Sequence, residues 1–300
     1  MPRSHDAARS GVDTPFGLRR RACLTAALAL LPLAARAEPM RVAAIDWAML
    51  ETALALGITP VAATELVRFR VDAVTPAVPA TVVDLGLRGS PNLELLITTA
   101  PDVILTSPWY AFIEHRLASV AKLVTHTVYT PGEPPWPKAL AALRVVGQRL
   151  GVVEHALAVE AQTKKTIAMR ARALRPYRDR PCYIVQIGDA RHVRMLGDDS
   201  LFGSVLMALG LQNAWEARSR FSFAAPVPIE QLATTADARI LVVSEVPALV
   251  RDSLAHSTLW RRLTPVAESR VHFLDNINPF GGVPAGLRFA ALLHRALTAP

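Results

Sequence analysis

The apolar positions of this chain fall into short β-branched runs that alternate with longer segments of helical spacing. The runs "MRVAAI" (residues 40–45) and "DVILTS" (residues 102–107) have the length and composition of buried strands. Between them, "WAMLETALALGI" has helical spacing and contains Gly57 near its end, a residue typical of helix ends. "TVVDLGL" predicts a further strand, and "PNLELLITTA" a further helix. Alternating strands and helices predict a parallel sheet covered by helices.

The same order of elements returns after residue 180. Strands are predicted at "CYIVQIG", "VRMLG", "RILVVSEV" and "VHFLDN", and helices at "LFGSVLMALGL" and "IEQLATTAD". The chain therefore predicts an α/β protein with two similar lobes, each built on a central, mostly parallel sheet. The alternative, an α/β barrel, would need more strands at more even spacing.

The segment between the predicted lobes contains no helix breaker from residue 152 to residue 174, and Pro176 ends it. About 23 residues at 1.5 Å each make a rod roughly 35 Å long. Such a helix either packs on the surface of one lobe or joins both lobes rigidly, with a ligand cleft between them. The fold prediction takes the second arrangement. Its parts are an export signal (1–37), an N-terminal lobe (38–150), the connecting helix (151–176) and a C-terminal lobe (177–300).

The first 37 residues have the composition of an export signal. A basic stretch, Arg19 to Arg21, precedes an Ala/Leu-rich run, and Ala35-Arg36-Ala37 is a small-x-small cleavage site. The apolar run is too short to span a bilayer. "RRACL" also fits a twin-arginine export pattern, although the general export route stays open. We expect cleavage after Ala37 and a mature protein in the periplasm.

Charge, cysteine and histidine content exclude several functions. The whole chain carries +8, but six Arg and two Asp lie in the first 37 residues, so the mature chain carries +4 without basic runs. This is no nucleic-acid-binding pattern. Only Cys182 remains after cleavage, so no internal disulfide is expected. The histidines show no metal-ligand spacing, and no hydrolase, nucleotide-binding or dinucleotide-binding motif occurs, so we expect neither a protein-held metal or cofactor nor an enzyme.

Two stretches about 136 residues apart follow the same pattern. "NLELLITTAPDVILTS" and "PIEQLATTADARILVVS" align Glu94 with Glu230, and both predict a helix followed by a strand. Two acidic residues on two corresponding helices suit a two-fold symmetric basic partner. Alternatively, each glutamate only complements the helix dipole in the first turn.

Several motifs give the chain a specific resemblance. "DWAMLETALALGI", "DLGLRGSPNLELL", "TSPWY", "RHVRMLGDDSLFGSVLMALGLQNAW" and "PIEQLA" occur in order over most of the mature chain. The sequence resembles periplasmic substrate-binding proteins of the helical-backbone type that serve ABC importers, and within them the ferric hydroxamate siderophore binders. The resemblance implies a monomer that delivers a ferric siderophore to a membrane permease. It also implies that Glu94 and Glu230 dock on permease arginines, and that iron is bound only through the siderophore.

The resemblance also implies where the ligand binds. Arg88, in "GLR", would fork its guanidinium toward the oxygens around a ferric centre, and Tyr110 would hydrogen-bond the chelate. Trp47 follows the first predicted strand and is a candidate to face the cleft. Trp109 is a further candidate, and the pair Trp109-Tyr110 after a buried strand could instead pack as a lid.

The predicted second-lobe wall departs from the family pattern. "SRFSFAAP" and "DNINPFGG" place Ser222 and Asn278 where the family has tryptophans, with Phe221, Phe223 and Phe280 close by. A more polar ferric chelate, such as a citrate-containing hydroxamate, would suit these positions and Asn276. Cobalamin and haem are competing ligands, and an exported enzyme with an active site between the lobes is the alternative from another class.

Overall fold

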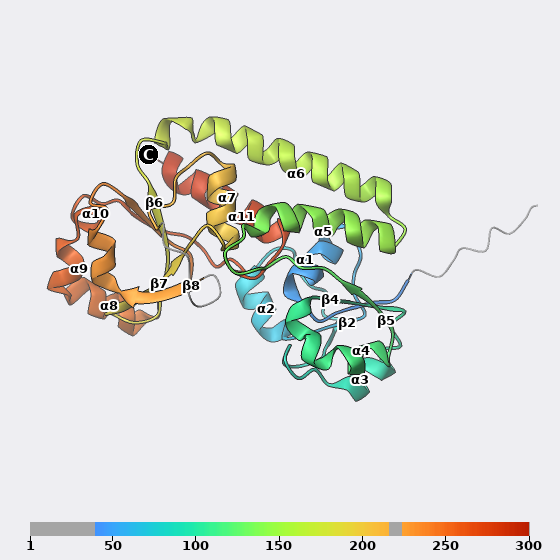
Figure 1. Cartoon of the computed structure of the whole chain (residues 1–300). Helices are drawn as coiled ribbons and strands as arrows, with labels where there is room; N and C mark the ends of the chain where they lie inside the picture. The colour runs from blue at the N-terminus through green and yellow to red at the C-terminus, as the bar shows by residue number, and fades with distance from the viewer. Residues whose placement is uncertain (1–39, 216–223, 300) are drawn as a thin grey trace, which may run out of the picture. The chain divides into compact units, whose positions relative to one another are not determined.

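A computed structural model describes residues 40–215 and 224–299 of the chain (Figure 1). The first sheet has the strand order β3-β2-β1-β4-β5, and all of its pairings are parallel. Its strands are β1 (Val42–Ala44), β2 (Ala62–Ala63), β3 (Val83–Asp84), β4 (Val103–Thr106) and β5 (Lys122–Thr125). The predicted strand–helix alternation of the first lobe is therefore confirmed.

The second sheet has the order β10-β9-β6-β7-β8 and is mixed. Its strands are β6 (Cys182–Ile187), β7 (His192–Leu196), β8 (Ala224–Pro228), β9 (Arg239–Val242) and β10 (Val271–Phe273). β10, β9 and β6 are parallel, whereas β7 and β8 pair antiparallel. Only four residues join β6 to β7, too few for a crossover helix. The predicted α/β class with two sheets is confirmed, and the second sheet is less parallel than the sequence indicated.

Eleven α-helices lie in the described residues. They are α1 (Trp47–Ala55), α2 (Leu66–Ala73), α3 (Leu93–Thr98), α4 (Glu114–Ala118), α5 (Pro135–Arg149), α6 (Val153–Ala173), α7 (Leu201–Ala208), α8 (Ala248–His256), α9 (Thr258–Arg262), α10 (Thr264–Ala267) and α11 (Val283–Thr298). Short 3₁₀ segments are η1 (Pro108–Ile113), η2 (Arg175–Tyr177) and η3 (Ile229–Ala233). None of these helices is long and apolar enough to cross a membrane.

The predicted helix "IEQLATTAD" is wrong in type and length, because the structure has only η3 there. The Thr234 hydroxyl bonds the carbonyl of Gln231, and the Tyr183 hydroxyl lies 2.7 Å from Thr234 Oγ1 and 3.0 Å from Thr235 Oγ1. Threonine hydroxyls that bond nearby groups in this way compete with continued helix formation.

One apolar core lies between the two sheets. The side chains of Val42 and Ala44 on β1, and of Cys182 and Ile184 on β6, belong to the same buried cluster as residues of α1, α5, α6, α7 and α11. The alternate residues on these strands, such as Ala43 and Tyr183, join separate clusters on the outer face of each sheet. This alternation follows the two-residue period of a strand. Both sheets thus share a single layer of helices.

The long helix α6 packs on two helices of this layer. The guanidinium of Arg144 in α5 donates two hydrogen bonds to the carboxylate of Glu160 in α6, from Nε at 2.6 Å and from Nη2 at 2.8 Å. At the other end, Arg170 donates to the carbonyl of Leu287 in α11, at 3.2 Å. α5 and α6 run side by side in Figure 1. The segment from 152 to 174 is therefore one helix, as predicted, tied to helices that precede and follow it in sequence.

A buried glutamate ties α1 to the start of α11. The side chain of Glu51 is fully buried, and its Oε1 accepts a hydrogen bond from Asn278 Nδ2 at 2.8 Å. Its Oε2 accepts from the backbone N–H groups of Gly282 and Ala285, at 2.8 and 3.0 Å. The first N–H groups of a helix have no partner within the helix, and a negative charge there is favourable. Glu51, in the first helix of the described chain, thus caps the N-terminus of the last helix, α11.

Gly281 lies directly against this carboxylate. A Cβ at Gly281 would lie 2.5 Å from both Glu51 oxygens and from Ala285 Cβ. Such distances are shorter than van der Waals contact, so the loop needs glycine here.

We expect the free energy of unfolding to fall as Glu51 ionises. Burial raises its pKa from 4.5 to about 7, although the three N–H donors oppose this shift. A group with a raised folded-state pKa stabilises the fold below its unfolded pKa and loses that contribution as pH rises through the folded value. Relative to Glu51→Gln, the wild type should therefore lose about 3 kcal/mol at most between pH 5 and pH 8.

Urea unfolding of both proteins at pH 5 and pH 8 measures this difference. A difference that is constant, or that grows in favour of the wild type with pH, would contradict the assignment.

Candidate ligand-binding site

A cavity of about 390 Å³ lies at the carboxyl end of the first sheet. Asp46 and Trp47 follow β1, Glu65 follows β2, Arg88 follows β3, and Tyr110 follows β4. The carboxyl ends of parallel strands form one edge of a sheet, which is where open α/β folds bind ligands. The remaining lining residues are Gly89, Trp109, Phe112, Tyr129 and Phe280. The cavity therefore has a mostly aromatic wall with a few charged groups.

Arg88 is held on this wall by an ion pair and a ring contact. Its Nε donates to Glu65 Oε2 at 2.8 Å, and its backbone N–H donates to Glu65 Oε1 at 3.1 Å. Its guanidinium carbon lies 4.0 Å from the centroid of the Trp47 ring, within cation–π range. The Glu65 carboxylate engages only one of the five guanidinium N–H donors. Glu65 therefore leaves the terminal amino groups available to a ligand and to the hydrogen bond that Arg88 makes with the Tyr110 side chain.

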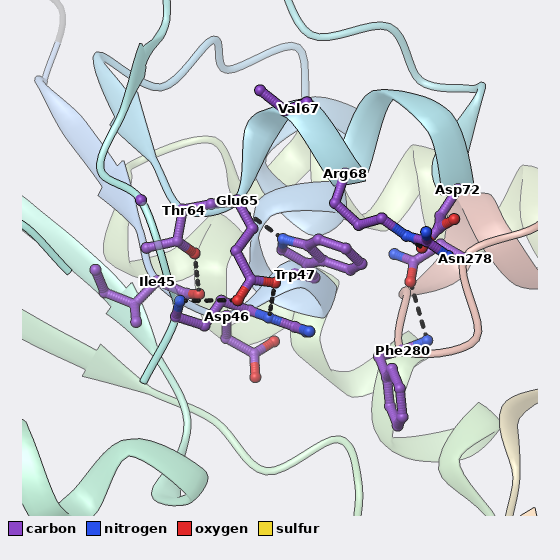
Figure 2. A network of polar contacts seen from close by, with 12 residues as sticks. Ile45, Asp46, Trp47, Thr64, Glu65, Val67, Arg68, Asp72, Asn278 and Phe280 are labelled. Atoms are coloured by element: carbon purple, nitrogen blue, oxygen red, sulfur yellow. Dashed lines mark hydrogen bonds and ion pairs between the residues drawn. The ribbon is translucent and has the colours of Figure 1, made fainter. Parts of the chain in front are cut away.

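Trp47 is a fixed platform for the guanidinium. Its indole N–H donates to the carbonyl of Thr64 at 3.1 Å, and the Thr64 hydroxyl donates to the carbonyl of Ile45 at 2.7 Å (Figure 2). Phe69 of α2 contacts the ring edge-on, with centroids 5.3 Å apart. The sequence placed Trp47 after a strand, and the structure shows that it lines the cavity while only 3% exposed.

Asp46 forms the floor of the cavity. One carboxylate oxygen accepts the N–H groups of Ala48 and Met49, at 2.8 and 3.1 Å, and so caps α1. The other accepts the hydroxyl of Ser107 at 2.7 Å. Burial raises the pKa of Asp46, and these hydrogen bonds oppose the increase. Its main role is to hold β1, α1 and the loop after β4 together.

Tyr110 and Trp109 lie on η1, which is separated from β4 by Ser107 alone. Burial raises the pKa of the Tyr110 hydroxyl; the charges of Asp46 and Glu65 add to this, and Arg88 opposes it. The hydroxyl is therefore protonated at neutral pH and can donate to a ligand. Trp109 is 46% exposed at the rim, and its indole N–H donates to the carbonyl of Tyr129 at 3.2 Å. Both residues line the cavity, as expected from "TSPWY".

Phe280 and Tyr129 complete the wall. Their rings meet edge-on with centroids 5.9 Å apart, and the Tyr129 hydroxyl donates to the carbonyl of Gly281 at 2.6 Å. Burial raises the pKa of Tyr129 well above its ordinary value, and the charges of Glu51 and Asp46 add to this. The loop between β10 and α11 is thus fixed to the first lobe.

Asn278 requires a correction. It was expected to contact the ligand, but its side chain is fully buried. Its amide N–H₂ donates to Glu51. Its amide oxygen accepts the N–H of Phe280 at 3.0 Å, a contact that Figure 2 shows. Asn278 thus positions the loop that carries Phe280, and it does not line the cavity. Asn276 is also engaged within the protein, because its Oδ1 accepts the N–H of Glu245 at 3.0 Å.

Phe221, Ser222 and Phe223 lie outside the described residues, so their predicted place in the site stays a prediction. Glu94 and Glu230 are exposed, in the first turns of α3 and η3. Neither lines the cavity.

Sequence reasoning missed five wall residues: Asp46, Glu65, Gly89, Phe112 and Tyr129. Glu65 adopts a left-handed backbone conformation, with φ 51° and ψ 41°, which no sequence pattern marks for this residue type. Asp46 did carry a signal, since an aspartate directly before a helix is a typical N-cap. Tyr129 follows β5 in a long connection, and only the three-dimensional packing places it at the cavity.

Within the described residues, no group of three or more His, Cys, Asp or Glu side chains is arranged to hold a metal ion. A larger hollow of about 640 Å³ lies at the ends of β9 and β10, but Phe273 is the only aromatic residue among its described lining residues. The aromatic cavity around Arg88 is thus the better candidate for binding a sizeable organic ligand.

Comparisons with known proteins agree with this architecture. The chain is 29% identical to the iron(3+)-hydroxamate-binding protein FhuD of Escherichia coli (strain K12), over 94% of this chain and 97% of that protein. It is 27% identical to the achromobactin-binding periplasmic protein of Dickeya dadantii, over 86% and 88% of the two chains.

Solved structures share the fold. The crystal structure of the Fe³⁺–Desferal-bound siderophore-binding protein FhuD from Vibrio cholerae superposes with a TM-score of 0.81 at 23% identity, covering 87% of this chain and 98% of that one. Staphylococcus aureus SirA in complex with staphyloferrin B gives a TM-score of 0.66 at 19% identity, covering 87% and 94%. The periplasmic binding protein family model matches residues 42–277, and this chain therefore belongs to the periplasmic binding protein family.

Proposed function

We propose that this chain is a periplasmic substrate-binding protein that captures a ferric siderophore of the hydroxamate type and delivers it to an inner-membrane ABC importer. The observation that carries the proposal is the Arg88 guanidinium, stacked on Trp47 in an aromatic cavity. It is supported by the similarity to a hydroxamate-binding relative along nearly the whole chain.

The cavity offers the contacts that a ferric hydroxamate needs. Hydroxamate oxygens around the iron accept hydrogen bonds from the Arg88 amino groups and from the Tyr110 hydroxyl. The rings of Trp47, Trp109 and Phe280 pack against the organic backbone of the chelate. The iron is held by the siderophore and not by the protein, and the protein catalyses no reaction. Binding requires only the formation of these contacts and the release of water.

In this proposal, two exposed glutamates bring the loaded protein to the importer. Glu94 and Glu230 each dock on basic residues of one permease subunit, with the protein acting as a monomer. The segment before residue 38 directs export, by the twin-arginine or the general route, and is removed after Ala37. The exposure of both glutamates is compatible with docking.

Substitution of Arg88 should weaken binding of the ferric complex. Arg88→Ala removes the forked donors and should raise the Kd for a ferric tris-hydroxamate about 10- to 100-fold, because hydrogen bonds from a charged group contribute about 1.5–3 kcal/mol. Arg88→Lys keeps the positive charge but loses the planar pair of N–H donors, and should raise the Kd by an intermediate amount. Quenching of the tryptophan fluorescence of residues 38–300 measures the Kd, since Trp47 and Trp109 line the cavity.

The matched control is Arg116→Ala, which removes an exposed arginine of α4. Ferric catecholates, iron-free siderophores, cobalamin and haem complete the ligand set. Equal Kd values for Arg88→Ala and Arg116→Ala would exclude Arg88 from the site. If only cobalamin or haem binds, the assignment to the periplasmic binding protein family stands and the proposed ferric hydroxamate ligand is wrong.

Charge reversal at the docking glutamates should block delivery and leave capture intact. In Glu94→Lys/Glu230→Lys, we expect uptake of radioactive ferric hydroxamate to fall more than about tenfold, because like charges across an interface repel. Ligand affinity should stay within about twofold, since neither residue lines the cavity.

Glu114→Lys/Glu154→Lys is the control, because these residues are also exposed acids in the first turns of helices, α4 and α6. If both double variants lose uptake equally, Glu94 and Glu230 only complement the dipoles of their helices and do not dock on the permease.

A further inference from the structure

Glu65 is an acidic residue on the cavity wall that belongs to no motif of the sequence. Its side chain is 20% exposed, and the residue lies between β2 and α2 (Figure 2). Its backbone is left-handed, a conformation that costs a residue with a side chain roughly 1–3 kcal/mol. The N–H of Glu65 donates to the carbonyl of Gly86 at 2.7 Å, and its carbonyl accepts the N–H of Phe69 at 2.8 Å. The surrounding structure thus holds Glu65 in this conformation.

In this backbone conformation, the Glu65 carboxylate contacts Arg88. Both carboxylate oxygens are engaged, one by the backbone N–H of Arg88 and one by its Nε. The arginine side chain is 24% exposed, so the pair is partly removed from water and weakly screened. The Nε contact and the Trp47 ring fix the plane of the guanidinium, and Glu65 does not use its terminal amino groups.

Glu65 also changes the charge of the cavity. Among the described lining residues, Arg88 is the one cation, whereas Asp46 and Glu65 are both acidic. An arginine without this neighbour would attract anionic ligands. The ion pair keeps the directional N–H donors of the guanidinium and cancels much of its field.

We propose that Glu65 is a positioning and selectivity residue, which orients Arg88 and makes the cavity favour neutral or cationic ferric chelates over anionic ones. This inference rests on the proposed function. Three hydroxamates carry three negative charges, which balance Fe³⁺ and give a neutral centre. Catecholate and citrate complexes keep excess negative charge at the iron. The citrate-containing ligand that the polar residues of the second lobe indicated is therefore disfavoured.

Three chelates with the same iron centre and different charge test the proposal. Ferrioxamine B carries a pendant ammonium group, its N-acetyl derivative is neutral, and its N-succinyl derivative is anionic. For the wild type, we expect the ammonium form to bind about tenfold more tightly than the succinyl form, with the acetyl form between them. In Glu65→Gln, the affinities for the ammonium and succinyl forms should differ by less than about threefold. Fluorescence quenching of residues 38–300 gives the Kd values.

Two further variants separate charge from positioning. Glu65→Asp keeps the charge but shortens the side chain by one methylene group, so all three affinities should fall together while the ratio stays. Glu154→Gln removes one exposed acid of α6, far from β2 in sequence and absent from the cavity wall, and should change nothing.

A wild-type ratio near one, or a ratio unchanged in Glu65→Gln, would overturn the proposal. Should Glu65→Gln fail to fold, the wild-type ranking decides by itself. Failure of all three chelates to bind the wild type would instead contradict the proposed function.

Discussion

The structure depends on one apolar core that both sheets share. Alternate residues of β1, β4, β6 and β9 pack into a common cluster with α1, α5, α6, α7 and α11, so the two sheets cannot separate without exposing buried apolar surface. Glu51 adds a polar connection, because its buried carboxylate caps α11 and holds Asn278. The loop that carries Phe280 is consequently fixed against the first lobe. These buried contacts hold the cavity wall in place, and a binding site that is held in place loses less entropy on binding.

The chemistry of the site follows from strand order. Four adjacent parallel strands, β3-β2-β1-β4, end at the same edge, and each is followed by a residue that faces the cavity. Trp47 supports Arg88, Glu65 orients it, and Asp46 holds the floor. Aromatic rings supply area, while a few directional donors supply specificity. This combination suits a bulky organic chelate with oxygen atoms around its centre.

The sequence predicted those parts of the molecule that depend on local pattern. Strand runs, the breaker-free helix α6, and Arg88 and Tyr110 after strands were all visible in it. It failed where tertiary contacts override a local pattern. The run after Pro228 forms only η3, because threonine hydroxyls bond within the turn and to Tyr183. Asn278 follows a strand, like a ligand contact, yet its amide is used by Glu51. Glu65 depends on a left-handed backbone that no residue preference indicates.

The most direct test of the central claim is calorimetric titration of residues 38–300 with a neutral ferric tris-hydroxamate and with the same siderophore without iron. We predict a sub-micromolar Kd for the ferric complex and binding at least about a hundredfold weaker for the iron-free form, because only the complex presents a compact set of oxygens to Arg88 and Tyr110. Equal affinity for both forms, or no heat of binding for the ferric complex, would contradict the account.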